Sequence, residues 1–401
     1  MRSPEKIKIC AKFFACIFLP PAMSLRIHVG IINLLNRPNR RQKIISLATE
    51  LRRASFCSSG EIVSINLVEA VDGVSQSFEE LFLRYGLKPF SNWAVADPEN
   101  RFPSSWRKGQ TSGGIASGLS HIDTASLLMN SPSFHPGDYL LILEDDCYLT
   151  TSDVKKSWDY FLECLNSANR LVPEWEMLML GAAGHRSDIA PARPVVGSDI
   201  IEYAGFSYLT TMYFMSQKGA EKLVSVRKTC LSNMLAFDEL HNALAGLSSR
   251  RDVELKFPSC LIAPLVLLSS TQSLVRQDPQ DGVHDTEVSA GSRVSRWQEK
   301  ASVDSGNNLS TGRDNIVPYK LTVPVAKGGS ESIHWWRRSG HPIQRETLIE
   351  QFGISRRRQS VSRPGMLSVM MKHYADQPVP TSVKFPVSFD HTEMATRTYG
   401  S

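Results

Sequence analysis

The sequence contains no run of 18 or more consecutive apolar residues, which excludes an ordinary transmembrane helix. Its seven cysteines form no CxxC pair and lie far apart along most of the chain, so neither a zinc site nor a disulfide framework is indicated. The net charge of +5 is small for 401 residues and gives no argument for a nucleic-acid partner. The remaining picture is a globular protein, with 42% hydrophobic and 21% charged residues.

Residues 1–24 are expected to form a leader. Arg2, Lys6 and Lys8 precede a short apolar stretch at residues 13–19, an order typical of a secretory signal peptide. The alternative is an unstructured extension, or a start codon placed too early. A signal peptide would direct the protein to the lumen of the endoplasmic reticulum or Golgi, and otherwise the cytoplasm is expected.

The first regular pattern, residues 25–68, predicts a βαβ unit. A strand over 25–34 precedes a helix for which Asn36 suits the N-cap and Pro38 the first turn. An apolar stripe follows at helical spacing (Ile44, Leu47, Ala48, Leu51), and residues 60–68 form a second strand. Strand, helix and strand at this spacing favour an α/β fold with a parallel sheet.

Residues 139–143 form a second apolar run that ends in Glu144, Asp145 and Asp146. The run predicts a buried strand, and ligands of open α/β sheets bind beyond the carboxyl ends of the strands. If the strand continues, alternation places Glu144 and Asp146 on one face and Asp145 on the other. Two carboxylates on one face suit Mg²⁺ or Mn²⁺ bound together with a substrate's phosphates. The alternative is a solvated acidic loop.

A glycine-rich stretch at residues 113–118 leads into Ser120, His121 and a helix that is expected to run to about Met129. Glycines at a helix start let backbone N–H groups approach a phosphate, although a tight packing turn explains them equally. His121 can contact a phosphate or secure the start of the helix, and both roles stay open.

Further strands and helices are predicted up to about residue 268, and the composition changes near Gly282. Residues 25–288 are therefore expected to form the folded domain, and residues 289–401 a low-order Ser-, Arg- and Pro-rich tail that is dispensable for the fold from about Gly291. The segment 334–338 is the one part of this tail expected to dock or to form a short element.

Several motifs follow one another along the chain. They are Ile32-Asn33-Leu34, Arg37-Pro38-Asn39-Arg40-Arg41, Leu119-Ser120-His121, Glu144-Asp145-Asp146, the segment from Gly205 to Leu223, and Asp238-Glu239. In this order they resemble glycosyltransferase family 25, which includes bacterial lipooligosaccharide and eukaryotic procollagen galactosyltransferases. The later motifs, together with Asn92-Trp93, resemble the procollagen branch. Asn39 and Gly114 depart from the pattern, since the family has Asp and Glu there.

The resemblance implies a GT-A (Rossmann-like) fold, Mn²⁺ or Mg²⁺ as cofactor, and a UDP-sugar donor, UDP-galactose before UDP-glucose. The acceptor would be a hydroxyl of a protein, such as hydroxylysine of a collagen-like chain, or of a glycan. Glu144 and Asp146 would hold the metal, with His284 a further candidate. Asp238, then Glu239, would act as general base, although acids at a helix start are also favoured by the dipole. The nucleotide sugar would contact Asn33, Arg37, Arg40, Ser120, His121 and Asp145.

A second function stays open. The family contains catalytically silent members that act in adhesion or interaction, and the departures at Asn39 and Gly114 favour that reading, while the intact acidic triplet favours an enzyme. A phosphate-handling hydrolase using the same acids is a third possibility, but the sequence offers it no evident nucleophile.

Overall fold

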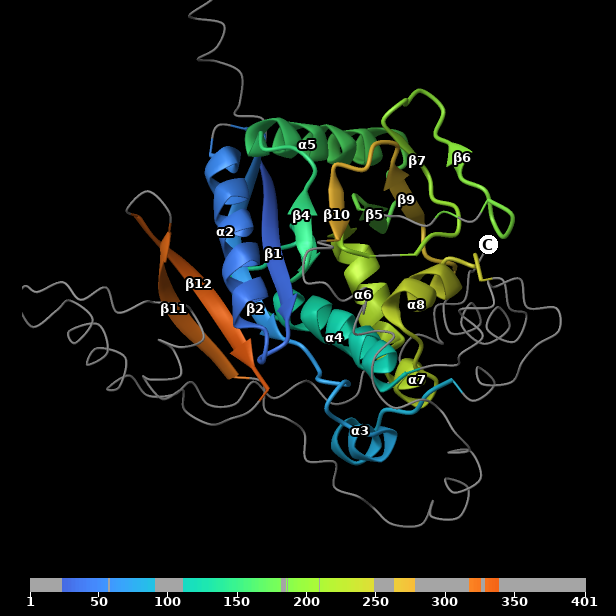
Figure 1. Ribbon diagram of the computed structural model, residues 1–401. Helices are drawn as coiled ribbons and strands as arrows, with labels where there is room; N and C mark the ends of the chain where they lie inside the picture. The colour runs from blue at the N-terminus through green and yellow to red at the C-terminus, as the bar shows by residue number, and fades with distance from the viewer. Residues whose placement is uncertain are drawn as a thin grey trace, which may run out of the picture.

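The computed structural model describes residues 24–56, 58–90, 111–181, 185, 187–208, 210–248, 263–277, 317–325 and 329–338 (Figure 1). The predictions for the leader before residue 24, for Asn92-Trp93 and for His284 lie outside these residues. Within the described part of the chain, no helix combines the length and the apolar character that crossing a membrane requires.

A ten-stranded mixed sheet forms the centre of the molecule, in the order β11-β12-β2-β1-β3-β8-β5-β9-β7-β6. Strands β12, β2, β1 and β3 run parallel to one another, whereas β8 runs antiparallel to both β3 and β5. The strands are β1 (Leu25–Asn33), β2 (Gly60–Glu69), β3 (Tyr139–Glu144), β5 (Met177–Met179), β6 (Arg193–Pro194), β7 (Ile201–Tyr203), β8 (Met212–Ser216), β9 (Leu267–Ser270), β11 (Val317–Val325) and β12 (Gly329–Arg337).

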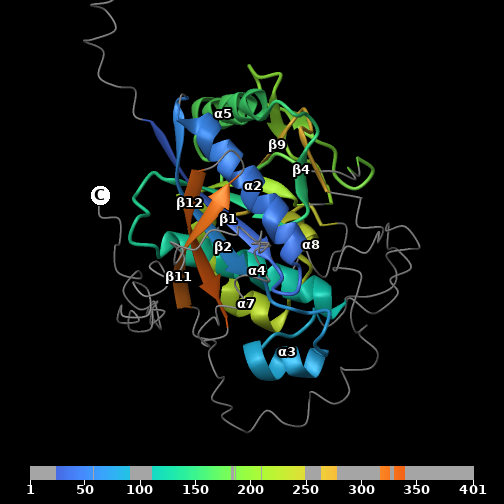
Figure 2. The ribbon, with the colours of Figure 1, turned by 60° about the vertical axis from the view of Figure 1, so that its left-hand side comes forward.

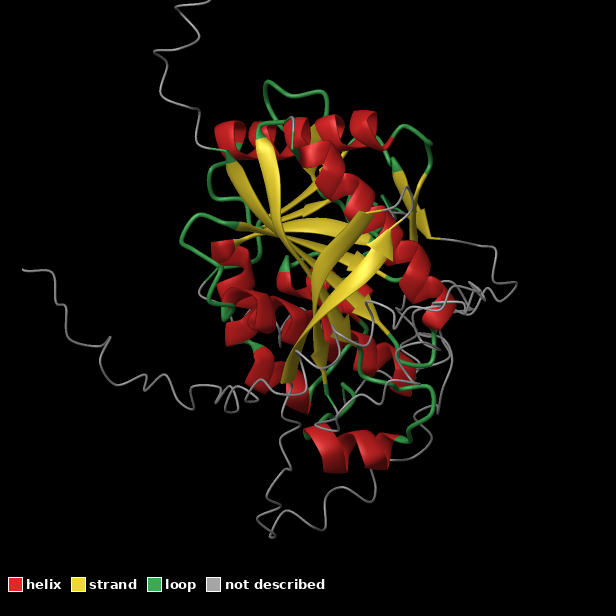
Figure 3. Ribbon diagram, turned by 90° about the vertical axis from the view of Figure 1, so that its left-hand side faces the viewer, coloured by secondary structure: helices red, strands yellow, loops and turns green. Residues whose placement is uncertain are grey.

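Helices cover both faces of this sheet (Figure 3). One face packs on α2 (Pro38–Ser55) and α5 (Val154–Leu171). The other packs on α4 (Ser112–Met129), α6 (Gln217–Ser225) and α8 (Phe237–Leu244), with α3 (Phe78–Tyr85) and α7 (Arg227–Ser232) beside them. A strand between two helical layers must be apolar on both sides, which explains the unbroken apolar run of β3. The predicted α/β fold is confirmed, and the parallel-rich sheet is consistent with a Rossmann-like GT-A domain.

The βαβ unit forms as predicted. Helix α2 begins with Pro38 in its first turn, where the missing N–H of proline has no intrahelical partner to lose. Its N-cap is Arg37, one residue later than the expected Asn36. Ile44, Ala48 and Leu51 of the predicted stripe are buried against the sheet.

The sheet continues into the segment that the sequence predicts to be a low-order tail. Strand β12 pairs in parallel with β2, and β11 pairs antiparallel with β12 at the edge of the sheet (Figure 2). The boundary expected at residue 288 therefore does not hold for these strands. Apolar residues alternate with other residues along 317–325, a period-two pattern typical of a strand that the expectation of a low-order tail overlooked. Strand β12 is stabilised by pairing with β2, in which Asn66 stands opposite His334, 268 residues later in the chain.

Candidate active site

The carboxyl ends of β1 and β3 meet at one edge of the sheet, where β1 ends at Asn33 and β3 at Glu144. The chain turns at Asp145 and Asp146 and then forms β4 (Cys147–Leu149), which pairs with β10 (Val275–Gln277) in a separate two-stranded sheet. The alternation predicted for residues 144–146 is wrong, because the strand stops at Glu144 and the next two residues belong to a turn.

The turn brings Asp145 and Asp146 to one cation. Arg40, in the first turn of α2, places Nη1 3.4 Å from Oδ1 of Asp145 and 3.4 Å from Oδ2 of Asp146. Asn33 donates from Nδ2 to Oδ2 of Asp145 at 2.6 Å, and Gln277 donates from Nε2 to Oδ2 of Asp146 at 2.8 Å. Oδ1 of Asp146 is buried and has no hydrogen-bond partner among the described residues. Asp146 therefore keeps one oxygen available for a ligand.

Glu144 belongs to a second set of contacts, on the α4 face of the sheet. Its Oε1 accepts from Thr210 Oγ1 at 2.9 Å and lies 3.1 Å from Nε2 of His121. The other ring nitrogen, Nδ1 of His121, lies 2.9 Å from the hydroxyl of Tyr213. Burial lowers the pKa of His121 to about 3, so the ring is neutral and carries one proton. An ionised Glu144 can only accept, which assigns that proton to Nε2 and makes Tyr213 the donor to Nδ1.

Asp238 and Glu239 lie in the first turn of α8, and both are buried. The ring of Phe237 stacks on His121 with 3.9 Å between centroids, which places this end of α8 against the Glu144 cluster. Oδ1 of Asp238 has no hydrogen-bond partner in the described part of the chain. Burial, reinforced by the charge of Glu144, raises the pKa of Asp238 to about 7.

The acids of this region carry more negative charge than one arginine balances. Burial raises the pKa of Glu144 and of Asp145, in both cases against the opposing effect of Arg40. The pKa of Asp146 rises to about 7 through burial first and then through the charges of Glu144 and Asp145. A bound cation would stabilise the ionised form of such a carboxyl group and lower its pKa. Even so, no three His, Cys, Asp or Glu side chains in the described ranges converge as a ready-made metal site.

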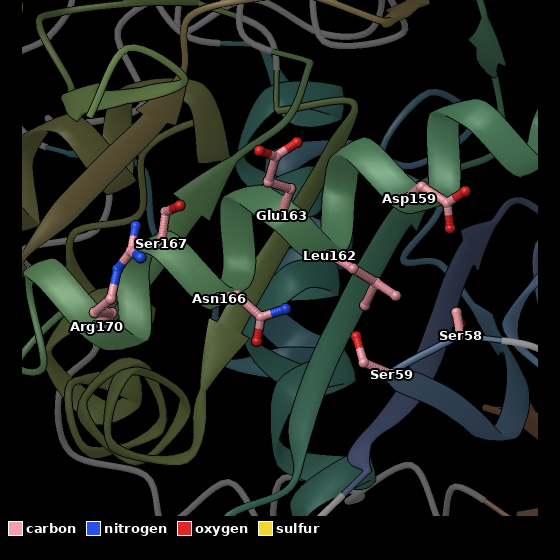
Figure 4. A pocket seen from close by; sticks show the side chains of 8 residues that line it. All are labelled: Ser58, Ser59, Asp159, Leu162, Glu163, Asn166, Ser167 and Arg170. Atoms are coloured by element: carbon pink, nitrogen blue, oxygen red, sulfur yellow. The ribbon is translucent and has the colours of Figure 1, made fainter. Parts of the chain in front are cut away.

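A pocket of about 140 Å³ adjoins the acidic turn. Two cationic residues of α2, Arg40 and Lys43, line it together with Asp145 and Asp146. A larger and more open pocket of about 600 Å³ lies along α5, lined by residues such as Ser59, Glu163 and Arg170 (Figure 4). Ser59 precedes β2, so that pocket lies at the amino ends of the parallel strands, away from the acids. Of these two pockets, the smaller one is lined by the predicted site residues Arg40, Asp145 and Asp146.

Ser120, His121 and Arg37 were predicted to contact the nucleotide, and the structure shows structural roles for Ser120 and Arg37 in the first place. The Ser120 hydroxyl accepts from the backbone N–H of Val71 and donates to the carbonyl of Ala116, so it joins α4 to the loop after β2. The helix α4 begins at Ser112, earlier than expected, which places Ser120 and His121 in its middle and makes the second role offered for His121, securing the helix start, wrong. Arg37 caps α2 through its backbone, at the start of the segment that carries Arg40.

Several supporting residues of the site were not predicted from the sequence. Arg41 is fully buried and donates from Nε to Oδ1 of Asn33 at 2.7 Å, which orients the amide that holds Asp145. Its position beside Arg40 in the basic motif was the available signal, but arginine is usually at the surface. Thr210 and Gln277 contact Glu144 and Asp146, and Tyr213 contacts His121, from other strands and loops, and only the fold reveals them.

A comparison with models of known protein families gives no match. The chain is similar to a "Glycosyltransferase 25 family member" of Aedes aegypti, with 28% identity over 214 residues, which are 53% of this chain and 30% of the relative. It is also similar to a protein of the same name from Drosophila melanogaster, with 27% identity over 215 residues, 53% of this chain and 29% of the relative. The chain thus spans less than a third of the length of either relative. These similarities support a glycosyltransferase related to family 25.

Proposed function

We propose that this chain is a metal-dependent glycosyltransferase of family 25 that moves a hexose from a UDP-sugar to a hydroxyl acceptor. One observation carries the proposal: Oδ1 of Asp146 has no hydrogen-bond partner among the described residues, and Asp146 lines a pocket together with two cationic residues, Arg40 and Lys43. Cations beside the acids suit the diphosphate of the donor, because arginine binds phosphate oxygens bidentately. The similarity to two family 25 proteins supports the same conclusion.

Asp146 fits the expected metal better than Glu144 does. Mg²⁺ and Mn²⁺ prefer oxygen ligands, and Mg²⁺ is commonly held by only one or two carboxylates plus substrate phosphates. A site of this kind needs no cluster of three protein ligands, so the free oxygen of Asp146 agrees with it. Oε1 of Glu144 is already engaged by Thr210 and His121. When bound, the metal would act as a Lewis acid for the departing diphosphate.

Asp238 is the proposed general base, with Glu239 the second candidate. A base must be ionised near the working pH and still bind a proton firmly, and a carboxyl with a pKa of about 7 meets both needs. Its Oδ1, which has no partner in the described ranges, would accept from an acceptor hydroxyl. UDP-galactose is the first donor to test and UDP-glucose the second. Hydroxylysine of a collagen-like chain or a glycan is the proposed acceptor.

A catalytically silent interaction protein is the second candidate. The contact of Arg40 with both Asp145 and Asp146 favours it, because a guanidinium there partly neutralises the acids without any metal. The two functions differ in what Mn²⁺ does. In an enzyme, Mn²⁺ would compete with Arg40 for Asp146 and would be required for UDP release. In a silent relative, adding Mn²⁺ would cause no UDP release.

A donor screen tests the proposal. Purified protein is incubated with UDP-galactose, UDP-glucose and other UDP-sugars, with and without Mn²⁺ and with and without a collagen-like hydroxylysine peptide, and released UDP is measured. The proposal predicts release that requires the metal and favours one hexose. Absence of release with every donor and acceptor would favour the silent protein.

A further inference from the structure

Strand β12 lies beside β2 and extends the parallel half of the sheet (Figure 2). The strand pairs with β2 such that Trp335 faces Leu67. Two of its apolar side chains, Ile333 and Trp335, belong to the same core cluster as β1, β3 and α2. The buried residues of this segment are Ile333, Trp335, Trp336, Arg337 and Arg338.

Two ion pairs attach this segment to the domain, one partly buried and one buried. Arg337 donates from Nε to Oε2 of the partly buried Glu69 at 3.0 Å, and Arg338 donates from Nη1 to Oδ2 of the buried Asp123 at 2.8 Å. Arg338 also donates from Nε to the carbonyl of Glu69 at 2.8 Å. Breaking a buried pair leaves an uncompensated charge, so the pair of Arg338 with Asp123 makes separation of the segment from the domain unfavourable. The strand is thereby held in one register.

From this strand a short series of contacts leads to the acidic turn. The guanidinium of Arg41 lies over the Trp335 ring, 5.4 Å from its centroid. Arg41 donates from Nε to Oδ1 of Asn33 at 2.7 Å, and Asn33 donates from Nδ2 to Oδ2 of Asp145 at 2.6 Å. Each contact fixes the next, since an amide whose oxygen is held by Arg41 must direct its NH₂ group toward Asp145.

The aromatic face is the part of Trp335 that this arrangement needs. Arg41 is fully buried, and burial lowers the pKa of its guanidinium to about 10, so it stays charged at neutral pH in surroundings that disfavour charge. A ring face attracts such a cation, whereas an aliphatic side chain of similar bulk only fills space. Arg337 lies over the same ring at 4.8 Å, so the tryptophan orders two cations at once.

We propose that Trp335 is a positioning residue for the candidate active site, which acts through Arg41 and Asn33 to hold the acidic turn at Asp145. The proposal rests on the function proposed above for that turn. It also assigns to residues beyond 288 a role in activity, in place of a dispensable tail.

The test compares three variants of the full chain. Trp335→Phe keeps a ring, Trp335→Leu keeps apolar bulk without a ring, and Trp336→Phe removes a neighbouring indole N–H that donates to Oδ1 of Asn66. Supporting residues around a metal site typically matter by about 10- to 100-fold. Metal-dependent UDP release should therefore fall at least about tenfold in Trp335→Leu and stay within about threefold of wild type in the two Phe variants.

A double-mutant cycle shows whether Trp335 acts through Asn33. Trp335→Leu should add little to the loss caused by Asn33→Ala if both belong to one series of contacts, whereas independent effects would multiply. Equal activity of Trp335→Leu and Trp335→Phe, or full multiplication in the cycle, would overturn the proposal.

Hydrogen exchange of residues 140–149 gives a readout that does not require activity. Exchange there should increase in Trp335→Leu and stay at the wild-type level in Trp336→Phe. If wild-type protein releases no UDP, the proposed function fails while the exchange comparison still decides the positioning role. Unchanged exchange in Trp335→Leu, or an equal increase in Trp336→Phe, would contradict that role.

Discussion

Asn33 donates a 2.6 Å hydrogen bond to Asp145, joining the carboxyl ends of two neighbouring parallel strands that lie 112 residues apart in sequence. The bond explains why the two aspartates of the acidic turn are not equivalent. Both oxygens of Asp145 have partners, from Asn33 and Arg40. Oδ1 of Asp146 has no hydrogen-bond partner within the part of the chain that the structure describes. The first aspartate shapes the turn and the second is the candidate ligand.

Asp145→Asn should therefore reduce UDP release by about tenfold, the lower end of the effect of a supporting residue. The amide places an NH₂ group against Asn33 or Arg40, so the turn loosens while the free oxygen of Asp146 remains. Initial rates at saturating Mn²⁺ measure the effect, and Asn39→Ala, an exposed position of α2, serves as the control. A loss larger than that of Asp146→Asn would make Asp145 the principal ligand.

The candidate base predicts a pH dependence. Since the pKa of Asp238 is raised from 3.8 to about 7, kcat/KM should rise with pH up to about 7 and then level off. Asp238→Asn should remove both the activity and this rise. An activity that is flat between pH 5.5 and 7.5 would exclude Asp238 as the base.

The same shift affects stability with a definite sign. The folded state binds the Asp238 proton more tightly than the unfolded state, so this group lowers the free energy of unfolding as pH rises between about 4 and 7. Asp238→Asn lacks the contribution. Denaturant unfolding at pH 5 and pH 7.5 should show a smaller decline in the free energy of unfolding for the variant than for wild type. An equal decline would place the pKa of Asp238 near its ordinary value.

Gly118 has a packing role, which agrees with the packing alternative offered for the glycine-rich stretch, although the residue lies within helix α4 and not in a turn. A Cβ atom there would lie 2.3 Å from the carbonyl oxygen of Leu235, a backbone atom that cannot move aside cheaply. Gly118→Ala should cost about 1–3 kcal/mol of unfolding free energy despite the better helix propensity of alanine. Ser117→Ala on the same helix is the matched control. Equal stability of the two variants would show that α4 can shift away from Leu235.

Truncation tests the corrected domain boundary. A chain ending at residue 290 loses β12 and leaves the buried Asp123 without Arg338, which should cost about 3 kcal/mol or more, or prevent folding. A chain ending at residue 345 keeps these contacts and should unfold like the full chain. If both truncated chains are equally stable, β12 contributes nothing to the domain.

Helix α2 and strand β3 could be predicted because the spacing of their apolar residues is visible within a short stretch of sequence. The stripe from Ile44 to Leu51 and the apolar run before Glu144 identified α2 and β3 because burial on one face or on two leaves a direct mark on the sequence. The turn at Asp145 could not be predicted. It exists because the chain enters a new strand at Cys147, which pairs with Gln277, 130 residues later in the sequence. Partners such as His121 for Glu144 depend on the same distant packing.

The buried arginines set a second limit on prediction. Arg41, Arg337 and Arg338 read as surface charges in any sequence analysis, yet all three are buried. Each is accounted for by a partner that only the fold supplies, such as Asn33 for Arg41 and Asp123 for Arg338. This is why the tail was expected to be dispensable although it carries part of the sheet.

The most direct measurement is Mn²⁺-dependent UDP release from UDP-galactose by wild type and Asp146→Asn, with thermal melts to confirm that both are folded. The amide keeps the size of the side chain but removes the charge that the metal needs. Metal stabilisation of a departing diphosphate amounts to several kcal/mol, and each ~1.4 kcal/mol is tenfold in rate, so a loss of at least about 100-fold is predicted. Near-normal release by a folded Asp146→Asn protein would contradict the metal site and the enzyme proposed on it.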